Sequence, residues 1–307
     1  MTIPEFAIDM KFISPHVEWW PQTNYKSHIA RVGRICYKSA GKQPPVKLTG
    51  QAREDFLYQR DRDMCSALWK AGHRSMFRHG TLYFHVPSKK EFPKKLWSIV
   101  KHSPYIGCTV QHGHVFISTN LQFTGERCDV CDLLIPFMVT EQEFIQQAIG
   151  CGCHRALELL RMTLVVTTQR IQGESYNRKS PNCIAEQSTR YVNLDKKGGV
   201  LICRPHWERN ARWYQRWASH LGYWVAEKVY QFLLRTGLKP EDARGNLTMN
   251  TYTVCAYTYT LREWRHIMDM RLRDLTGRAH PDAHIVAEQI SKIINDRMRQ
   301  YVADYEI

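Results

Sequence analysis

Stretches with helical spacing of apolar residues alternate along this chain with short runs of β-branched and aromatic residues. Residues 51–71 have helical spacing and end at Gly72, a typical helix stop, so we expect a helix there. Residues 81–86 and 114–119 are predicted to be strands. We find no internal repeat and no low-complexity linker. A chain of 307 residues can bury one substantial core or two small ones, and a single folded unit over residues 1–307 is the simplest expectation.

The remaining segments follow the same rules. Residues 1–50 mix short apolar runs with Pro, Gly and Lys, which indicates a strand and an irregular approach. Residues 164–168 predict another strand, and Pro240 marks a helix start. Helical spacing predicts further helices over residues 141–162 (interrupted around residues 150–152), 206–236, 261–272 and the tail 280–302. The expected core residues of the tail are Ile285, Ile290, Ile293 and Ile294.

Composition and cysteine content are those of a soluble globular protein. The hydrophobic content is 43% and the charged content is 23%, which are ordinary values. No run of about eighteen apolar residues is available for a membrane span. The N-terminus, MTIPEFAIDMKF, has no basic region followed by an apolar core, so we expect no secretory signal. The ten cysteines are accordingly expected to be reduced thiols in a cytoplasmic protein.

The net charge of +14 implies acidic partners. Nucleic acid, phosphorylated small molecules and the glutamate tail of a folate all fit, and net charge alone does not separate them. A non-enzymatic nucleic-acid-binding protein, the alternative to an enzyme, would gather its basic residues on one face with exposed aromatics. Here the basic residues are spread through the chain, and the aromatic residues within 206–236 have the spacing of a core or oligomer face.

The segment from Arg178 to Tyr191, RKSPNCIAEQSTRY, combines cations, a carboxylate, an amide and hydroxyls in a predicted loop. Pro181 and Asn182 favour a turn rather than a helix interior. Arginine makes planar two-point contacts to phosphate, and serine with backbone N–H groups can fill the remaining acceptor positions. The segment therefore suits a phosphate and the polar edge of a base, while a solvated surface loop is the alternative.

A second stretch, residues 238–271, strengthens the functional interpretation. Together the two stretches resemble the flavin-dependent thymidylate synthases (the ThyX family), whose signature is Arg-His-Arg, seven residues, then Ser-x-Arg. Here Arg178-Lys179-Ser180 is followed by seven residues and then Ser188-Thr189-Arg190, so the second half is intact and the first is altered. The family pattern His-x-(Ser/Thr)-x-Phe-x-His is matched by His73, Ser75, Phe77 and His79.

The resemblance implies a mixed α/β (α+β) fold, in which a mixed sheet is flanked by long helices, and assembly as a homotetramer. It implies reductive methylation of dUMP at C5 to give dTMP. Methylenetetrahydrofolate supplies the carbon, and FAD, reduced by NADPH, supplies the hydride. The protein must then bind the phosphate and stabilise negative charge on the uracil, with no need for a cysteine nucleophile or a metal.

Site residues are carried over position by position from the resemblance. The implied dUMP-binding residues are Glu186, Gln187, Ser188, Arg190, Arg244 and Arg271. In this set Arg190, with Ser188 and Gln187, holds the phosphate and sugar, and Arg271 favours the enolate-like form of the uracil. Arg271 and Ser188 are the implied catalytic residues.

The implied FAD-binding residues are His79, Arg178, Lys179, Asn250, Arg262 and His266. The chain departs from the family at Ser175, where a Gln or Glu is expected, and at Lys179 and Ser180, where His and Arg are expected. Lysine keeps a charge without a flat ring, and serine removes a cation. Hydroxymethylation at C5, an altered pyrimidine substrate, or a paralogue that binds nucleotide without turnover therefore stays open beside methylation.

Residues 87–165 form an interval that compact members of the family lack, so the resemblance implies an insertion within the single domain. Two cysteine pairs in this interval have spacings that can bind tetrahedral zinc, with buried reduced thiols as the alternative; they are Cys128, Cys131, Cys151 and Cys153. The second pair has one intervening residue and a helical context, which favours thiols. We expect no metal at these cysteines.

Overall fold

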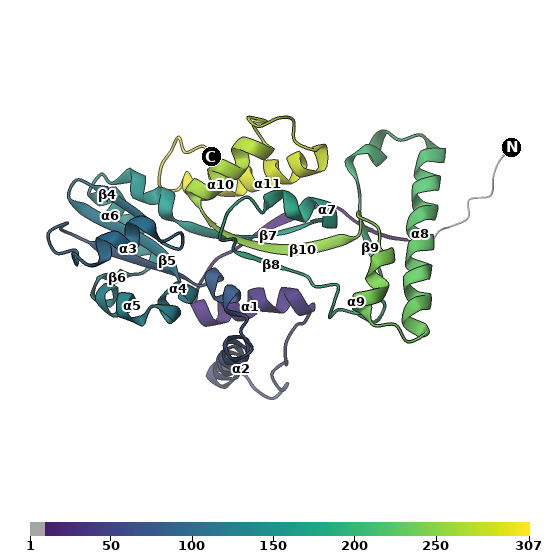
Figure 1. Cartoon of the computed structure of the whole chain (residues 1–307), viewed down its shortest axis with the longest axis horizontal. Coiled ribbons are helices and arrows are strands. Elements are labelled where there is room, and N and C mark those ends of the chain that lie inside the picture. Colours follow the sequence, from purple (N-terminus) through teal and green to yellow (C-terminus); the bar gives the residue numbers. More distant parts are fainter. Residues whose placement is uncertain (1–9) are drawn as a thin grey trace.

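The computed structural model describes residues 10–307 and arranges helices around three β-sheets (Figure 1). The first nine residues, whose composition argues against an export signal, lie outside the described part. The mixed α/β class is confirmed, since long helices flank the sheets. Within residues 10–307, no helix is both long and apolar enough to cross a membrane.

A four-stranded antiparallel sheet with the order β2-β7-β10-β8 forms the centre of the molecule. β7 (Arg161–Gln169) and β10 (Tyr252–Thr260) pair along their whole lengths. β2 (His16–Trp20) and the short β8 (Ile184–Glu186) form its two edges. The strand predicted over residues 164–168 is confirmed and is longer than predicted.

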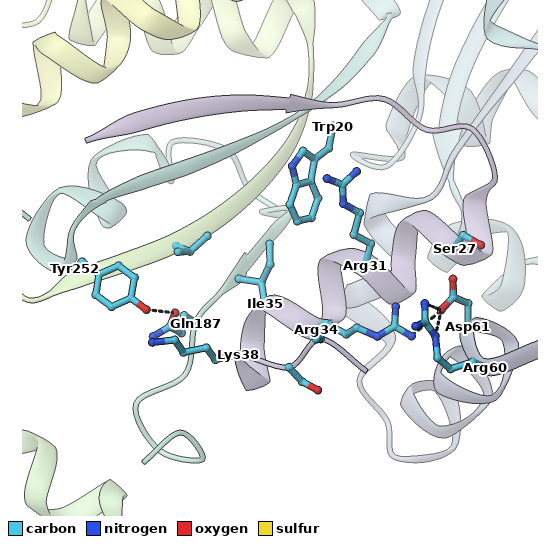
Figure 2. A pocket seen from close by; sticks show the side chains of 13 residues that line it. Trp20, Ser27, Arg31, Arg34, Ile35, Lys38, Arg60, Asp61, Gln187 and Tyr252 are labelled. Carbon is cyan, nitrogen blue, oxygen red and sulfur yellow. Dashed lines mark hydrogen bonds and ion pairs between the residues drawn. The ribbon is translucent and has the colours of Figure 1, made fainter. Parts of the chain in front are cut away.

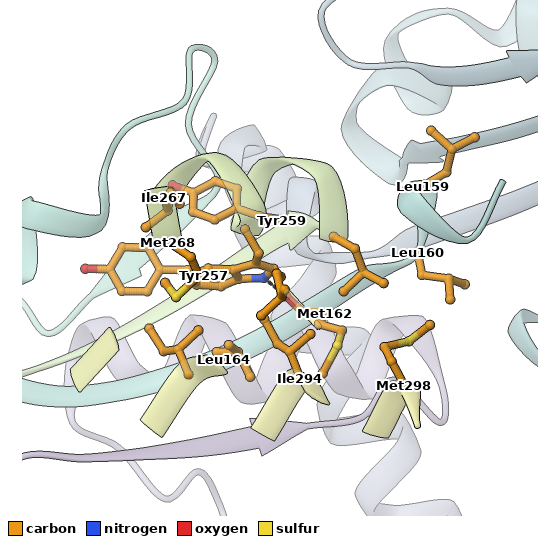
Figure 3. Close-up of a cluster of buried hydrophobic side chains, with 14 of the residues drawn as sticks. Leu159, Leu160, Met162, Leu164, Tyr257, Tyr259, Ile267, Met268, Ile294 and Met298 are labelled. Atoms are coloured by element: carbon orange, nitrogen blue, oxygen red, sulfur yellow. Dashed lines mark hydrogen bonds between the residues drawn. The ribbon is translucent and has the colours of Figure 1, made fainter. Parts of the chain in front are cut away.

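The two faces of this sheet carry side chains of different size. The face toward α10 (Leu261–Arg271) and α11 (Pro281–Met298) is lined by large residues. Figure 3 shows part of this core, including Leu164, Tyr257, Tyr259, Ile267, Met268, Ile294 and Met298. The opposite face presents the small residues Ala185 and Ala256 to α1 (Tyr25–Tyr37). Helices therefore cover both faces of the sheet (Figure 1).

Thr260 ends β10 and caps α10, so the chain passes from strand to helix without a loop. Its Oγ1 accepts a hydrogen bond from the Glu263 backbone N–H (3.2 Å), and the Glu263 carboxylate accepts one from the Thr260 N–H (2.9 Å). This capping box fixes the start of the helix predicted over residues 261–272. The tail helix is also confirmed as α11, with Ile290 and Ile294 fully buried and Ile285 and Ile293 partly buried.

The N-terminal part contains more helix than expected. After β1 (Lys11–Ile13) and β2, α1 begins where the Asn24 side chain accepts hydrogen bonds from two backbone N–H groups. The prediction of a strand and an irregular approach was wrong for α1, because charged side chains on its exposed face interrupt the apolar pattern. α2 (Gly50–Lys70) confirms the helix predicted over residues 51–71.

A second antiparallel sheet, with the order β4-β5-β3-β6, lies at one end of the molecule (Figure 1). β3 (Thr81–Val86) and β5 (His114–Asn120) confirm the two strands predicted there. β4 (Gly107–Gln111) and β6 (Met138–Val139) complete it. The interval 87–165 thus supplies most of this sheet, and its status as an insertion stays a prediction.

The helices of this end surround the second sheet. They are α3 (Leu96–His102), α4 (Leu121–Glu126), α5 (Cys128–Leu134) and α6 (Glu141–Gly150). α6 stops where an interruption was predicted, but the helix predicted up to residue 162 was wrong beyond it: a 3₁₀ turn covers His154–Leu159, and the chain enters β7 at Arg161, where it pairs with β10.

The opposite end is built by α8 (Trp213–Arg235), α9 (Pro240–Ala243) and β9 (Leu201–Cys203), which pairs with β1. The helix predicted over residues 206–236 is therefore too long at its start. A separate 3₁₀ turn, His206–Asn210, occupies that place because a tertiary contact holds it: the His206 N–H donates to Asp282 Oδ1 (2.7 Å).

Candidate functional site

A tight turn follows β8 and passes beside the end of α1. The Ser188 N–H donates to the Cys36 carbonyl (3.0 Å), and Ser188 Oγ accepts from the N–H groups of Arg190 (3.1 Å) and Tyr191 (3.4 Å). The turn leaves the Arg190 side chain more than half exposed, at 54%. The loop prediction for residues 178–191 was wrong only for the strand β8, whose three residues are held by pairing with β10.

Arg244 reaches this turn from a segment more than fifty positions further along the chain. Its Nη1 donates to Thr189 Oγ1 (3.2 Å). Arg190 Nη2 lies 3.6 Å from the carboxylate of Glu241, one turn earlier on α9. The structure thus brings together Ser188, Arg190 and Arg244, as the sequence motifs predict, and the result is an exposed, cationic turn suited to a phosphate.

Glu186 lies between two cavities at the end of β8. One cavity, of about 320 Å³, is also lined by Ser188 and Arg190, and the other, of about 460 Å³, is also lined by Arg178. The Glu186 carboxylate accepts a hydrogen bond from Thr253 Oγ1 (2.8 Å) and lies 3.4 Å from an Arg170 nitrogen. This strand end therefore connects the two groups of predicted site residues.

Arg271 ends α10 on the side of the Arg178 cavity. Its Nε donates to the carbonyl of Ser175 (2.9 Å). Burial lowers the pKa of the Arg271 guanidinium, and the nearby positive charge of Arg178 lowers it further. Neither arginine forms a salt bridge with another described residue. Two neighbouring cations without a carboxylate between them favour an anionic ligand.

The positive charge of the altered segment Arg178-Lys179-Ser180 is partly neutralised. Lys179 Nζ lies 2.8 Å from the Glu263 carboxylate, and Ser180 supplies no charge. Arg262 and His266 lie exposed on α10. Of the predicted flavin residues, Arg178, Arg262 and His266 are thus the ones with accessible polar groups.

His79 and Asn250 are placed differently from the other predicted flavin residues. His79 is fully buried, and its Nδ1 is 2.7 Å from Thr258 Oγ1. Asn250 donates from Nδ2 to the Tyr223 hydroxyl (2.8 Å), near the middle of α8. In the single chain neither side chain is gathered with Arg178, and their role at a flavin stays a prediction.

A larger cavity, of about 670 Å³, was not predicted from the sequence (Figure 2). Its lining includes four cationic side chains, Arg31, Arg34, Lys38 and Arg60. Asp61 lies 2.6 Å from Arg34 Nη2 and 3.0 Å from Arg60 Nη2, so a single carboxylate serves two of them. The Arg31 guanidinium stacks on Trp20, 3.6 Å from the ring centre.

This basic cavity adjoins the predicted site through Gln187. The Gln187 side chain is buried and accepts a hydrogen bond from the Tyr252 hydroxyl (3.2 Å), and both residues line the cavity (Figure 2). The signal in the sequence was the spacing of Arg31, Arg34 and Lys38, which places three cations along one side of a helix.

The zinc arrangement considered for the four cysteines is not formed. Among residues 10–307, the group of histidine, cysteine and carboxylate side chains that lies close enough to hold an ion is a different one and contains no cysteine. The thiol of Cys153 is buried and lies 3.2 Å from the Gln111 carbonyl, whereas Cys128 is exposed on α5. Burial raises the pKa of the Cys153 thiol to about 12.

Fold and site together define a mixed α/β protein with a cationic, phosphate-suited turn at a strand end. A family model described as thymidylate synthase complementing protein matches residues 119–298, which is more than half of the chain. The chain belongs to this family, which is the flavin-dependent thymidylate synthase family expected from the motifs. The match includes the turn at residues 186–190 and the segment around Arg244, and it leaves out the residues 73–79.

Two solved structures are similar to this chain. Both are the UMP/dUMP methylase PolB from Streptomyces cacaoi, bound with 5-Br dUMP in one case and 5-Br UMP in the other. The first is 16% identical with a TM-score of 0.43, and the alignment covers 94% of this chain and 93% of that one. The second is 15% identical with a TM-score of 0.42, and its alignment covers 94% of this chain and 92% of that one. No curated protein sequence matches this chain significantly.

Proposed function

We propose that the protein is a flavin- and folate-dependent enzyme that methylates dUMP at C5 to give dTMP. The observation that carries the proposal is the meeting of Ser188, Arg190 and Arg244 around one exposed turn. These residues come from two separate motifs of the family, and both motifs lie within the matched residues.

In this proposal the turn binds the nucleotide phosphate. Arg190 and Arg244 are both exposed and offer two guanidinium groups to the phosphate oxygens. A bound phosphate would compete with Glu241 for Arg190, and this weak contact of 3.6 Å is readily exchanged.

Arg271 acts on the base. Its Nε donates to the Ser175 carbonyl and its Nη1 to the Met270 carbonyl, which orients the guanidinium and leaves Nη2 for the uracil. Negative charge that develops on the uracil oxygen is then stabilised by Arg271, with Arg178 adding to the local positive field.

Arg178, Arg262 and His266 are the residues that fit a flavin, because their polar groups are accessible in the structure. When bound, FAD, reduced by NADPH, supplies the hydride, and methylenetetrahydrofolate supplies the carbon. Lys179 is less available, since Glu263 already binds its ammonium group. The basic cavity around Arg31, Arg34 and Lys38 suits the carboxylates of a folate glutamate.

The first test is the absorbance spectrum of the purified protein during titration with FAD, with and without dUMP. We expect a flavin spectrum that shifts when dUMP is added, and loss of flavin binding with retained dUMP binding in Arg178→Ala. A colourless protein that binds dUMP but not FAD would contradict the flavin part of the proposal.

The altered Arg178-Lys179-Ser180 segment favours a second candidate product, since one cation is missing and another is paired with Glu263. A hydroxymethyl group at C5, in place of methyl, is that candidate. Mass analysis of the nucleotide product distinguishes the two.

We also infer a homotetramer, supported by the surface of α8. Only three of its 23 residues are buried, and its exposed apolar residues include Trp213, Trp217, Trp224 and Phe232. An apolar helix face of this kind marks a protein–protein interface. It lies at the end of the molecule opposite the second sheet (Figure 1).

Charge placed on this face should break the assembly. We expect Trp217→Glu combined with Phe232→Glu to lower the mass measured by size-exclusion chromatography with light scattering. Val46→Glu, at a 98% exposed loop position, is the matched control and should leave the mass unchanged. An unaltered mass in the α8 variant would rule out this face as the interface.

A further inference from the structure

Two histidines and an aspartate form a group outside the site described above. His206 is the first residue of the 3₁₀ turn after β9. His280 and Asp282 lie at the start of α11, and Asp282 is 76 positions after His206 in the chain. One ligand atom from each residue lies within 4.8 Å of the others. Neither the sequence motifs nor the family resemblance assigns these residues a role.

The Asp282 carboxylate is the centre of the group. Its side chain is only 6% exposed, and Oδ1 accepts a hydrogen bond from the His206 backbone N–H (2.7 Å). Oδ2 accepts no hydrogen bond from the described residues and faces two histidine nitrogens, His206 Nδ1 at 3.3 Å and His280 Nδ1 at 3.7 Å. Because Oδ1 already accepts a hydrogen bond, Oδ2 is the carboxylate oxygen available to a cation between the two histidines.

His206 Nδ1 is the second candidate ligand atom of the group. It is buried, and no described group forms a hydrogen bond with it, although it lies 3.3 Å from Asp282 Oδ2. An ordinary histidine–aspartate pair would place a donated N–H between these atoms. Here the two atoms lie 3.3 Å apart without a hydrogen bond between them, and each can donate an electron pair to an ion.

The distances between these atoms suit a tetrahedral ion. Two ligand atoms about 2.0–2.1 Å from a tetrahedral Zn²⁺ lie about 3.3–3.4 Å apart, against about 3.0 Å in an octahedral site. The observed distances from Asp282 Oδ2 are 3.3 Å, at the tetrahedral value, and 3.7 Å, slightly above it, and the three ligand atoms lie within 4.8 Å of one another. We propose that His206, His280 and Asp282 bind a divalent transition-metal ion of the Zn²⁺ type, with the fourth position left to water.

Neighbouring contacts prepare these ligands. The His206 N–H fixes Asp282 through Oδ1, as outer-shell hydrogen bonds do in metal sites. His280 Nδ1 accepts from the Asp282 N–H at 3.2 Å, a long helix-capping contact that metal ligation would replace. The rings of His206 and His280 are nearly perpendicular, at 85°, with centres 5.4 Å apart.

The ion would join the end of β9 to the start of α11. α11 packs its apolar face into the main core, and the carbonyl of Ala283, next to Asp282, accepts a hydrogen bond from the Tyr176 hydroxyl. Metal binding should therefore stabilise the folded protein. Tyr176 follows Ser175, whose carbonyl accepts a hydrogen bond from Arg271. The ion would therefore also stabilise the position of Arg271 in the proposed active site.

The test is titration of the metal-free full-length protein with Co²⁺ and then Zn²⁺. Co²⁺ reports its ligands: nitrogen and oxygen donors in a tetrahedral site give a visible band, whereas thiolates add a charge-transfer band in the near ultraviolet. We expect one equivalent with the visible band alone, displaced by Zn²⁺, together with a raised melting temperature.

Three variants test the ligands. His206→Ala, Asp282→Asn and His280→Ser should each lose the visible band and the rise in melting temperature, and serine at 280 keeps a capping oxygen so that loss of the cap is not the cause. His284→Ala, on the same helix, is the matched control and should bind as the wild type does. A thiolate band, binding that survives in all three variants, or no binding at all would overturn the proposal.

Discussion

Replacing Arg271 by alanine is expected to lower kcat for dTMP formation at least about 100-fold, the usual cost of removing a group that stabilises transition-state charge. Arg190→Ala should be comparably damaging but act mainly on KM for dUMP, because its guanidinium is placed for the phosphate. Both proteins should still fold. Arg190 is more than half exposed and has one long ion pair, worth less than about 1 kcal/mol.

The matched control for Arg271 is Arg273→Ala, which removes the same charge two residues away. Arg273 pairs with Asp269 at 2.6 Å on the surface and is not one of the proposed dUMP-binding or FAD-binding residues. Activity is measured with dUMP, methylenetetrahydrofolate, FAD and NADPH, and folding by circular dichroism. Near-normal turnover in either Arg271→Ala or Arg190→Ala would remove that residue from the site.

Stability is expected to fall steeply below about pH 6.5, because two buried histidines stay neutral in the folded protein. Burial lowers the pKa of His79 to about 3, with His28, Arg161 and Arg78 nearby, and burial together with Arg31 lowers the pKa of His28 to about 4. A hydrogen-bonded chain joins them through Thr163 and Thr258.

The sign follows from proton binding. Below the unfolded pKa of about 6.5, the unfolded chain binds protons that the folded chain excludes, so stability is complete above that pH and is lost on acidification toward pH 4. Each histidine contributes about 1.4 kcal/mol per pH unit in this window. Urea unfolding across the range measures the slope.

His79→Asn keeps a hydrogen-bonding group for Thr258 and removes the titration. We expect it to lower the midpoint at neutral pH and to flatten the dependence on pH. His102→Asn, at an exposed position, is the control and should keep the wild-type slope. If the His79 variant has the wild-type slope, then the buried histidine is not the cause.

The elements that the sequence predicted well are those whose pattern is local. The strand at residues 81–86 and the helix at residues 261–272 carry their own periodicity and caps, and Pro240 marks a helix start without help from tertiary contacts. The turn at Ser188–Arg190 was recognisable for the same reason, since its residue types and spacing are contiguous. Local chemistry is readable from local sequence.

What the sequence missed depends on partners far along the chain. β8 is a strand because β10 pairs with it, and residues 206–210 form a separate turn rather than part of α8 because Asp282 holds the His206 N–H. The basic cavity likewise forms only when α1 and α2 bring their cations together. Periodicity within a single segment contains none of this information.

β10 acts as a spacer between the two halves of the proposed site. Its residue Cys255 lies opposite Glu186, and its last residue, Thr260, caps the helix that ends at Arg271. The number of β10 residues between Cys255 and Thr260 therefore sets the distance between the phosphate-suited turn and Arg271. A residue gained or lost within β10 would turn every following side chain to the other face, so evolutionary changes of length among relatives should gather in loops such as residues 39–48 and spare this strand.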